Sequence, residues 1–120
     1  MSIYRYDLLG IGHAIVDILS HCPHTFLEKE QLIPGSMTLV DESRADSLYA
    51  KLGPATECSG GSAANTLAGV ASLGGRCAFI GKVKDDQLGR IFRHDMRSLG
   101  VEFSTPAATS GPATARCGWR

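Results

Sequence analysis

Apolar residues along the chain form short runs bounded by glycine and proline. Three of these runs lack a helical period, at Tyr6–Gly12, Ala14–Leu19 and Ser36–Val40. Short apolar runs with β-branched residues are typical of buried strands, so each of the three is predicted to be a strand. Between the second and the third, the chain is punctuated by prolines, and a short helical turn is expected around Thr25–Gln31.

Three longer segments have the spacing of helices. Asp41–Leu52 is amphipathic, begins with acidic residues and stops at Gly53-Pro54, as helix termini commonly do. A helix rich in small residues is predicted over Ser62–Leu73. A second amphipathic helix is predicted over Gln87–Leu99, with Gly100 at its end and four residues directed to a core: Ile91, Phe92, Met96 and Leu99.

The order of these elements indicates the fold class. Cys77–Val83 is predicted to be a strand, and Val101–Pro106 and Ala113–Trp119 are weaker strand candidates. Strands that alternate with helices predict an α/β fold, with a mostly parallel sheet and helices on its faces.

Composition narrows the classes of function. The chain has 120 residues, enough for one domain at most, with 43% hydrophobic and 20% charged residues. Its 12 basic and 12 acidic residues balance, which disfavours a nucleic-acid partner. No apolar stretch approaches the ~20 residues that span a bilayer, and the first residues lack the layout of a signal peptide. A cytoplasmic protein without a membrane partner is therefore expected.

Known reactive motifs fail at their restrictive positions. The Gly10-Ile11-Gly12 pair after a strand lacks the third glycine of a dinucleotide fingerprint, because Ile15 stands there. Gly81-Lys82 lacks the other residues of a P-loop. The four cysteines are irregularly spaced and are expected to be free thiols, and the HCPH stretch at 21–24 is not expected to bind a metal.

The stretch TECSGGSAANT, at Thr56–Thr66, places two glycines before a predicted helix. Glycines there let a ligand approach the backbone, and the first N–H groups of a helix lack partners within it. Asn65 adds an acceptor and two donors. Close packing of the helix on a sheet explains the glycines equally well.

Asp17 lies inside the apolar run AIVDIL and is costly to bury without hydrogen-bond partners. Two sugar hydroxyls would supply such partners. The alternative is an acid that faces solvent at the edge of a strand.

Several segments together resemble the ribokinase-like (PfkB) sugar and nucleoside kinases. GGSAANTLAGVASLGGRCAFIGKVKDDQLG, at Gly60–Gly89, is similar to the family's N-terminal signature, and DLLGIGHAIVD, at 7–17, resembles its first strand and substrate-binding acid. The segments GSMTLVDE at 35–42 and GPATE at 53–57 look most like the adenosine-kinase-like branch.

The resemblance implies a ribokinase-like three-layer α/β sandwich, of which residues 1–120 form the N-terminal, acceptor-binding part, with a small β lid. Lid strands are expected at Ala14–Leu19, at Ser36–Val40 and near Val101. The resemblance implies six substrate-binding residues. Asp17 would bind two ribose hydroxyls. The other contacts to the sugar or base would come from His13, Gly60, Gly61, Ser62 and Asn65. His13 stands where many adenosine-kinase-like members have asparagine.

The resemblance also implies a reaction, the transfer of the ATP γ-phosphate to a hydroxyl of a sugar or nucleoside, with ATP and Mg²⁺ as cofactors. Adenosine is the expected acceptor. No glycine-rich turn ending in a general-base aspartate occurs in these residues, so this catalytic and ATP-binding part is expected to be absent and the 120 residues alone to be inactive. Two alternatives stay open: a kinase of ribose, fructose or a keto-sugar acid, and a non-catalytic remnant that binds ligand or self-associates as a homodimer through the lid or an exposed sheet edge.

Overall fold

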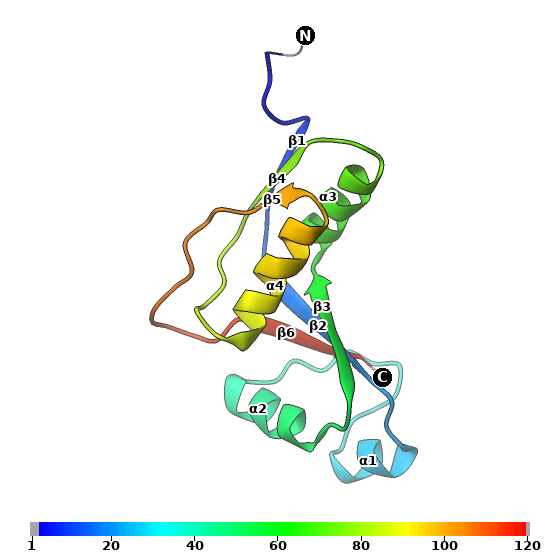
Figure 1. Ribbon diagram of the computed structural model, residues 1–120. Helices are drawn as coiled ribbons and strands as arrows, with labels where there is room; N and C mark the ends of the chain where they lie inside the picture. The colour runs from blue at the N-terminus through cyan, green and yellow to red at the C-terminus, as the bar shows by residue number, and fades with distance from the viewer. Residues whose placement is uncertain (1–2, 120) are drawn as a thin grey trace.

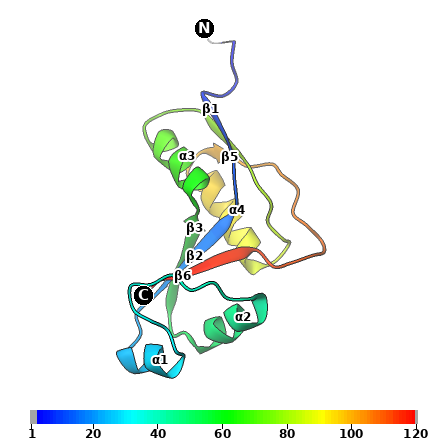
Figure 2. The same ribbon diagram turned by 180° about the vertical axis from the view of Figure 1, so that it is seen from behind.

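The computed structural model describes residues 3–119 and divides into a body and a lid (Figure 1). The molecule is elongated, with extents of 59 × 32 × 22 Å. Seen from either side, the body lies at one end and the lid at the other, and the chain passes between them several times (Figure 2). Among the described residues, no helix is both long and apolar enough to cross a membrane.

The body is a parallel sheet covered by helices on one face. Its strands are β1 (Leu8–Ile11), β4 (Cys77–Ile80) and β5 (Val101–Glu102), in the order β1-β4-β5. The helices α3 (Ser62–Ser72) and α4 (Gln87–Ser98) pack on the face that carries Phe79. The parallel α/β arrangement predicted from the order of the elements is therefore confirmed.

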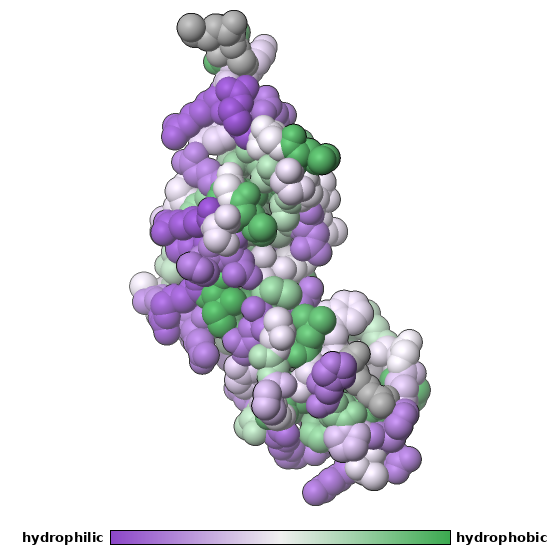
Figure 3. All heavy atoms as spheres, turned by 45° about the vertical axis from the view of Figure 1, so that its right-hand side comes forward, coloured by the Kyte–Doolittle hydropathy of each residue, from purple (hydrophilic) through white to green (hydrophobic). Residues whose placement is uncertain are grey.

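The other face of the body sheet lacks a helical layer within residues 3–119. Leu9, Ile11 and Ile80 lie on it and are between 44% and 73% exposed. On the face of the molecule drawn in Figure 3, apolar side chains form separate patches among hydrophilic ones. The described residues thus supply the sheet and one helical layer of the expected three-layer fold.

The lid is a second three-stranded sheet flanked by two helices. Its strands are β2 (Ile15–Ser20), β3 (Ala55–Gly60) and β6 (Ala115–Trp119), with β2 in the centre, antiparallel to β3 and parallel to β6. The helices α1 (His24–Lys29) and α2 (Glu42–Lys51) lie at its far end (Figure 1). Asp41 caps α2 by accepting a hydrogen bond from the Arg44 N–H at 2.7 Å.

Three expectations about the lid are wrong. Residues 36–40 form no strand, because no neighbouring strand pairs with them; Met37 and Leu39 are 83% and 86% exposed. The strand at Val101 pairs with β4 and so belongs to the body. The third error is an omission from the expected lid strands: β3, with the sequence ATECSG, was not predicted to be a strand, and it pairs with the whole of β2.

Three phenylalanines form the centre of the core. Phe79 from β4, Phe92 from α4 and Phe103 after β5 have ring centroids 5.4 to 5.5 Å apart and tilted or edge-to-face rings. Such pairs add to the stabilisation from buried area. Met96 is also fully buried, as predicted, whereas Leu99 at the end of α4 is 44% exposed.

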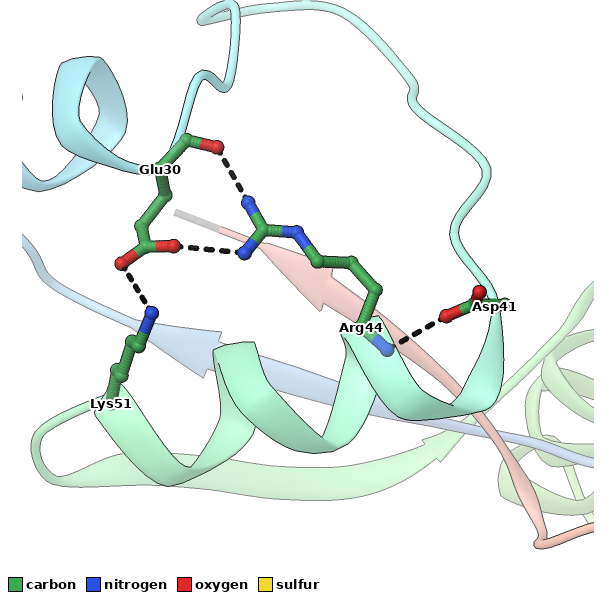
Figure 4. A network of polar contacts seen from close by, with 4 residues as sticks. All are labelled: Glu30, Asp41, Arg44 and Lys51. Carbon is green, nitrogen blue, oxygen red and sulfur yellow. Dashed lines mark hydrogen bonds and ion pairs between the residues drawn. The ribbon is translucent and has the colours of Figure 1, made fainter.

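A buried glutamate joins the two lid helices (Figure 4). Glu30, directly after α1 and 6% exposed, forms ion pairs with Arg44 and Lys51 of α2, each at 2.9 Å. Arg44 also donates to the Glu30 carbonyl oxygen at 2.6 Å. Hydrogen bonds from Lys51 and then Arg44 hold the pKa of Glu30 below its usual value, against the effect of burial.

The stability of the lid is expected to fall in acid because of this glutamate. A carboxyl whose folded-state pKa is lowered stabilises the fold above its unfolded pKa, about 4.3 for glutamate, and loses that contribution as the pH falls through the folded value. Glu30→Gln should lower the urea midpoint at neutral pH and flatten its decline in acid. Glu28→Gln, an exposed neighbour on α1, is the control and should follow the parent. Equal slopes for the parent and Glu30→Gln would contradict this prediction.

Candidate acceptor-binding site

Asp17 occupies the middle of the central lid strand. Its register partners are Cys58 on β3 and Cys117 on β6, so a carboxylate stands between two thiols in one row across the sheet. Asp17 is half-buried and makes no hydrogen bond or ion pair with residues 3–119, and its oxygens stay accessible. A strand-edge acid is therefore the wrong interpretation, and the carboxylate is available to a ligand.

Gly60, the last residue of β3, lies directly against this carboxylate. A Cβ atom at Gly60 would lie 2.5 Å from Asp17 Oδ2 and 2.7 Å from Oδ1, closer than such atoms approach. The first glycine of the pair therefore leaves room for the acid rather than for packing of the helix. Close helix packing is instead served by Gly12, where a Cβ would meet the Ala63 Cβ at 2.6 Å.

Gly61 turns the chain from β3 into α3. Its φ of +93° is in the region that favours glycine, and a Cβ there would lie 2.9 Å from the His13 carbonyl oxygen. Gly61 is the N-cap of α3 without a side-chain cap, and its carbonyl oxygen accepts from the Asn65 N–H at 2.9 Å. The unpaired N–H groups of the first turn thus begin next to Gly60 and Asp17.

The remaining predicted residues lie around this turn. Ser62 and Asn65 are in the first turn of α3, both are exposed, and within residues 3–119 neither side chain makes a hydrogen bond. His13 is brought to the turn by its backbone, while its side chain is exposed. The structure therefore brings all six predicted residues to one junction of β2, β3 and α3.

The environment of the two thiols beside Asp17 favours their neutral form. Burial, and next the Asp17 charge, raises the pKa of Cys58 and of Cys117; Asp95 adds to the effect at Cys58. Neutral thiols are weak nucleophiles, so they serve as small apolar walls. All four cysteines are free, as predicted. Residues 3–119 contain no group of three His, Cys, Asp or Glu side chains able to hold a metal ion.

Two hollows lie near the predicted residues or elsewhere on the lid. A hollow of about 310 Å³ lies between β1 and the start of α3 and shares only Ser62 with the predicted residues. Another, of about 420 Å³, lies at the far end of the lid near Leu19 and Pro54. Neither hollow is lined by Asp17.

Two supporting contacts were missed from the sequence. Asp95 in α4 accepts from the Ser59 N–H at 2.7 Å and so ties β3 to the body. Asp86 and Thr114 hydrogen-bond each other across the base of the lid. Asp95 lies within an amphipathic helix, and a helix pattern does not reveal which distant backbone group one of its side chains will meet.

Comparison with known proteins assigns the family. Residues 37–116 match the pfkB family of carbohydrate kinases. The chain is 56% identical to the adenosine kinase from Sinorhizobium meliloti, with a TM-score of 0.81 over 96% of this chain and 35% of that one. It is 51% identical to a probable sugar kinase protein from Rhizobium etli, with a TM-score of 0.80 over 95% of this chain and 34% of the other.

A curated relative has a different acceptor in its name. A 5-dehydro-2-deoxygluconokinase from Bacillus licheniformis is 48% identical over 103 residues, which is 86% of this chain and 25% of the relative. The chain thus spans about a quarter of the length of the curated relatives it matches. The fold is that of the ribokinase-like α/β kinases. The chain belongs to the pfkB carbohydrate kinase family.

Proposed function

We propose that these residues form the acceptor-binding part of an ATP-dependent kinase of nucleosides or sugars. The observation that carries the proposal is the Asp17 carboxylate, which is half-buried, has no hydrogen-bond or ion-pair partner within residues 3–119 and lies directly against Gly60, just before α3. Its oxygens stay accessible, so the hydroxyl groups of a ligand can take the place of water as hydrogen-bond donors to them.

A vicinal pair of hydroxyls fits this arrangement. One carboxylate accepts from two adjacent hydroxyls, and such charge-assisted hydrogen bonds are stronger than neutral ones. The free N–H groups at the start of α3 and the Asn65 amide supply donors and an acceptor beside it. Asp17 would then hold the sugar from the lid while Gly61, Ser62 and Asn65 hold it from the helix; His13 is the candidate for a further base or sugar contact.

Adenosine is the acceptor we propose, with its 5′-hydroxyl as the phosphorylated group. The identity of 56% with the S. meliloti adenosine kinase supports this choice. A keto-sugar acid is the second candidate, because the B. licheniformis relative is 48% identical. Both acceptors carry neighbouring hydroxyls, so Asp17 can bind either of them. Other residues of the site must then distinguish between the two acceptors.

ATP and Mg²⁺ are the cofactors that the family implies for the whole protein. The described residues do not fit a site for them, since they hold no cluster of three metal-ligating side chains and no glycine-rich turn ending in aspartate. The phosphoryl transfer step is therefore assigned to no residue here. The role of these residues is to bind and orient the accepting hydroxyl.

Ligand binding by the 120-residue chain tests the proposal. Calorimetric titration with adenosine should show binding, and Asp17→Asn should weaken it at least tenfold, because a hydrogen bond to a charged group contributes about 1.5–3 kcal/mol. Glu28→Gln removes the same charge on exposed α1 and should leave the affinity unchanged. Binding of 5-dehydro-2-deoxygluconate or fructose instead of adenosine would show that the proposed acceptor is wrong. Equal affinities of the parent and Asp17→Asn would contradict the proposal that Asp17 binds the acceptor.

Two further measurements separate the alternatives. We expect no ATP-dependent phosphorylation of adenosine by these 120 residues, and product formation would contradict this. Sedimentation of the same samples tests self-association through the outer lid strands β3 and β6, whose free edges are templates for pairing.

A further inference from the structure

Asp86, where the lid meets the body, caps a helix and also binds a residue that is distant in the sequence. Asp86 is the N-cap of α4, and its Oδ1 accepts from the Gly89 N–H at 2.7 Å, as a cap requires. The same oxygen also accepts from the Thr114 hydroxyl at 2.7 Å, and Oδ2 accepts from the Thr114 N–H at 3.0 Å. Both oxygens are thus used on a residue that is distant in the sequence.

Thr114 is buried, and its hydroxyl both donates and accepts a hydrogen bond. It is 4% exposed, and its hydroxyl accepts from the Lys84 N–H while it donates to Asp86. Gly89 leaves the required space, because a Cβ there would collide with the Lys84 carbonyl oxygen and lie 3.1 Å from Thr114 Oγ1. A side chain at position 89 would therefore disturb both Lys84 and Asp86, the two residues that hydrogen-bond to Thr114.

Thr114 directly precedes a lid strand, so its contact with Asp86 bears on the position of that strand. The next residue begins β6, and both ribbon views place the start of β6 beside the N-terminal end of α4 (Figures 1 and 2). β6 then pairs with β2 so that Cys117 stands beside Asp17. Upstream, the chain is held to the body by hydrogen bonds at Ala108, to Val83 and Asp85.

Other contacts hold β6 to the lid but not to the body. Arg116 pairs with Asp46 of α2, and the Ala113 N–H lies 3.5 Å from Glu42 of the same helix. Burial alone would raise the pKa of Asp86, but the hydrogen bonds from Thr114 and Gly89 outweigh it and hold that pKa below its usual value. Asp86 therefore stays charged at neutral pH and accepts at both oxygens.

We propose that Asp86 and Thr114 form a clamp that anchors β6 to the body and thereby positions the wall of the acceptor site beside Asp17. Asp86 acts through Thr114 and β6 and touches no ligand, so it is a positioning residue. The anchoring rests on the contacts above. Its effect on ligand affinity rests in addition on the proposed function.

Amide hydrogen exchange tests the anchoring without a ligand. In Asp86→Asn the new amide can still cap α4 but presents a donor toward the Thr114 N–H, so exchange of the β6 amides should speed up at least tenfold while α4 and β4 keep their protection. Thr114→Val should act in the same direction, and Thr114→Ser, which keeps the hydroxyl, should restore the parent pattern. Asp85→Asn, in an exposed pair with Arg90, is the matched control and should change nothing in β6.

Ligand titration of the same variants separates the two proposals. Asp86→Asn and Thr114→Val should weaken adenosine binding about tenfold, and Thr114→Ser should not. If β6 exchanges faster but the parent itself binds no nucleoside or sugar, the clamp stands and the proposed function fails. Unchanged β6 exchange in Asp86→Asn overturns the clamp. If that variant does not fold, unchanged exchange in Thr114→Val overturns it.

Discussion

Phe92→Ala is expected to destabilise the fold by about 3–5 kcal/mol, the usual loss for a buried phenylalanine cut back to alanine. Phe92 is fully buried, and its ring meets Phe79 at 5.5 Å and Phe103 at 5.4 Å. These neighbours come from β4 and from the chain after β5, so they cannot close the cavity without moving the body sheet. Because small domains have about 5–15 kcal/mol in total, the variant should be close to unfolding.

Urea denaturation followed by circular dichroism measures this loss. Leu99→Ala, just beyond the end of the same helix, is the matched control, and because Leu99 is 44% exposed it should cost less than about 1 kcal/mol. A loss for Phe92→Ala as small as that of the control would show that the three rings are not the centre of the core.

Gly60→Ala is expected to abolish most ligand binding while leaving the fold intact. The new Cβ would lie 2.5 Å from Asp17 Oδ2, and the end of the aspartate side chain can swing away at small cost. Gly60 does not have a positive φ, so the backbone accepts alanine without strain. The displaced carboxylate would lose its hydrogen bonds to the acceptor, which together contribute about 3 kcal/mol, or roughly a hundredfold in affinity.

The control for this variant is another glycine of the lid sheet. Gly118 in β6 has no atom within 4 Å of an added Cβ, so Gly118→Ala should keep the parent affinity. Melting curves of both variants should match the parent within a few degrees. Full affinity in Gly60→Ala would mean that Asp17 does not hold the ligand where we propose.

The elements predicted correctly are those whose signals are local. The helix α4 has apolar positions at helical spacing and Gly100 just beyond its end, so its predicted bounds agree with the structure to within a residue. The candidate site residues were also named from the sequence, since the glycine pair and an acid in an apolar run are visible there. The structure brings these residues together, and their roles, which the family resemblance implies, stay a prediction.

The errors have one physical cause, which is that strands are completed by partners. The apolar segment at residues 36–40 has the composition of a strand but meets no partner, whereas the polar β3 is a strand because β2 lies beside it. Strand propensity reflects such neighbours more than the residues themselves. The placement of Val101 in the lid failed in the same way.

The sequence by itself determined the α/β class, the helices and the core positions Phe92 and Met96 of α4. Only the tertiary structure decided that Asp17 stands on a central strand between two thiols, that Gly60 makes room for its carboxylate, and that Asp86 reaches Thr114. Helix periodicity and capping act over a few neighbouring residues, so they can be read along the chain. Sheet register and hydrogen bonds between distant residues depend on which segments meet, and that is settled when the whole chain packs.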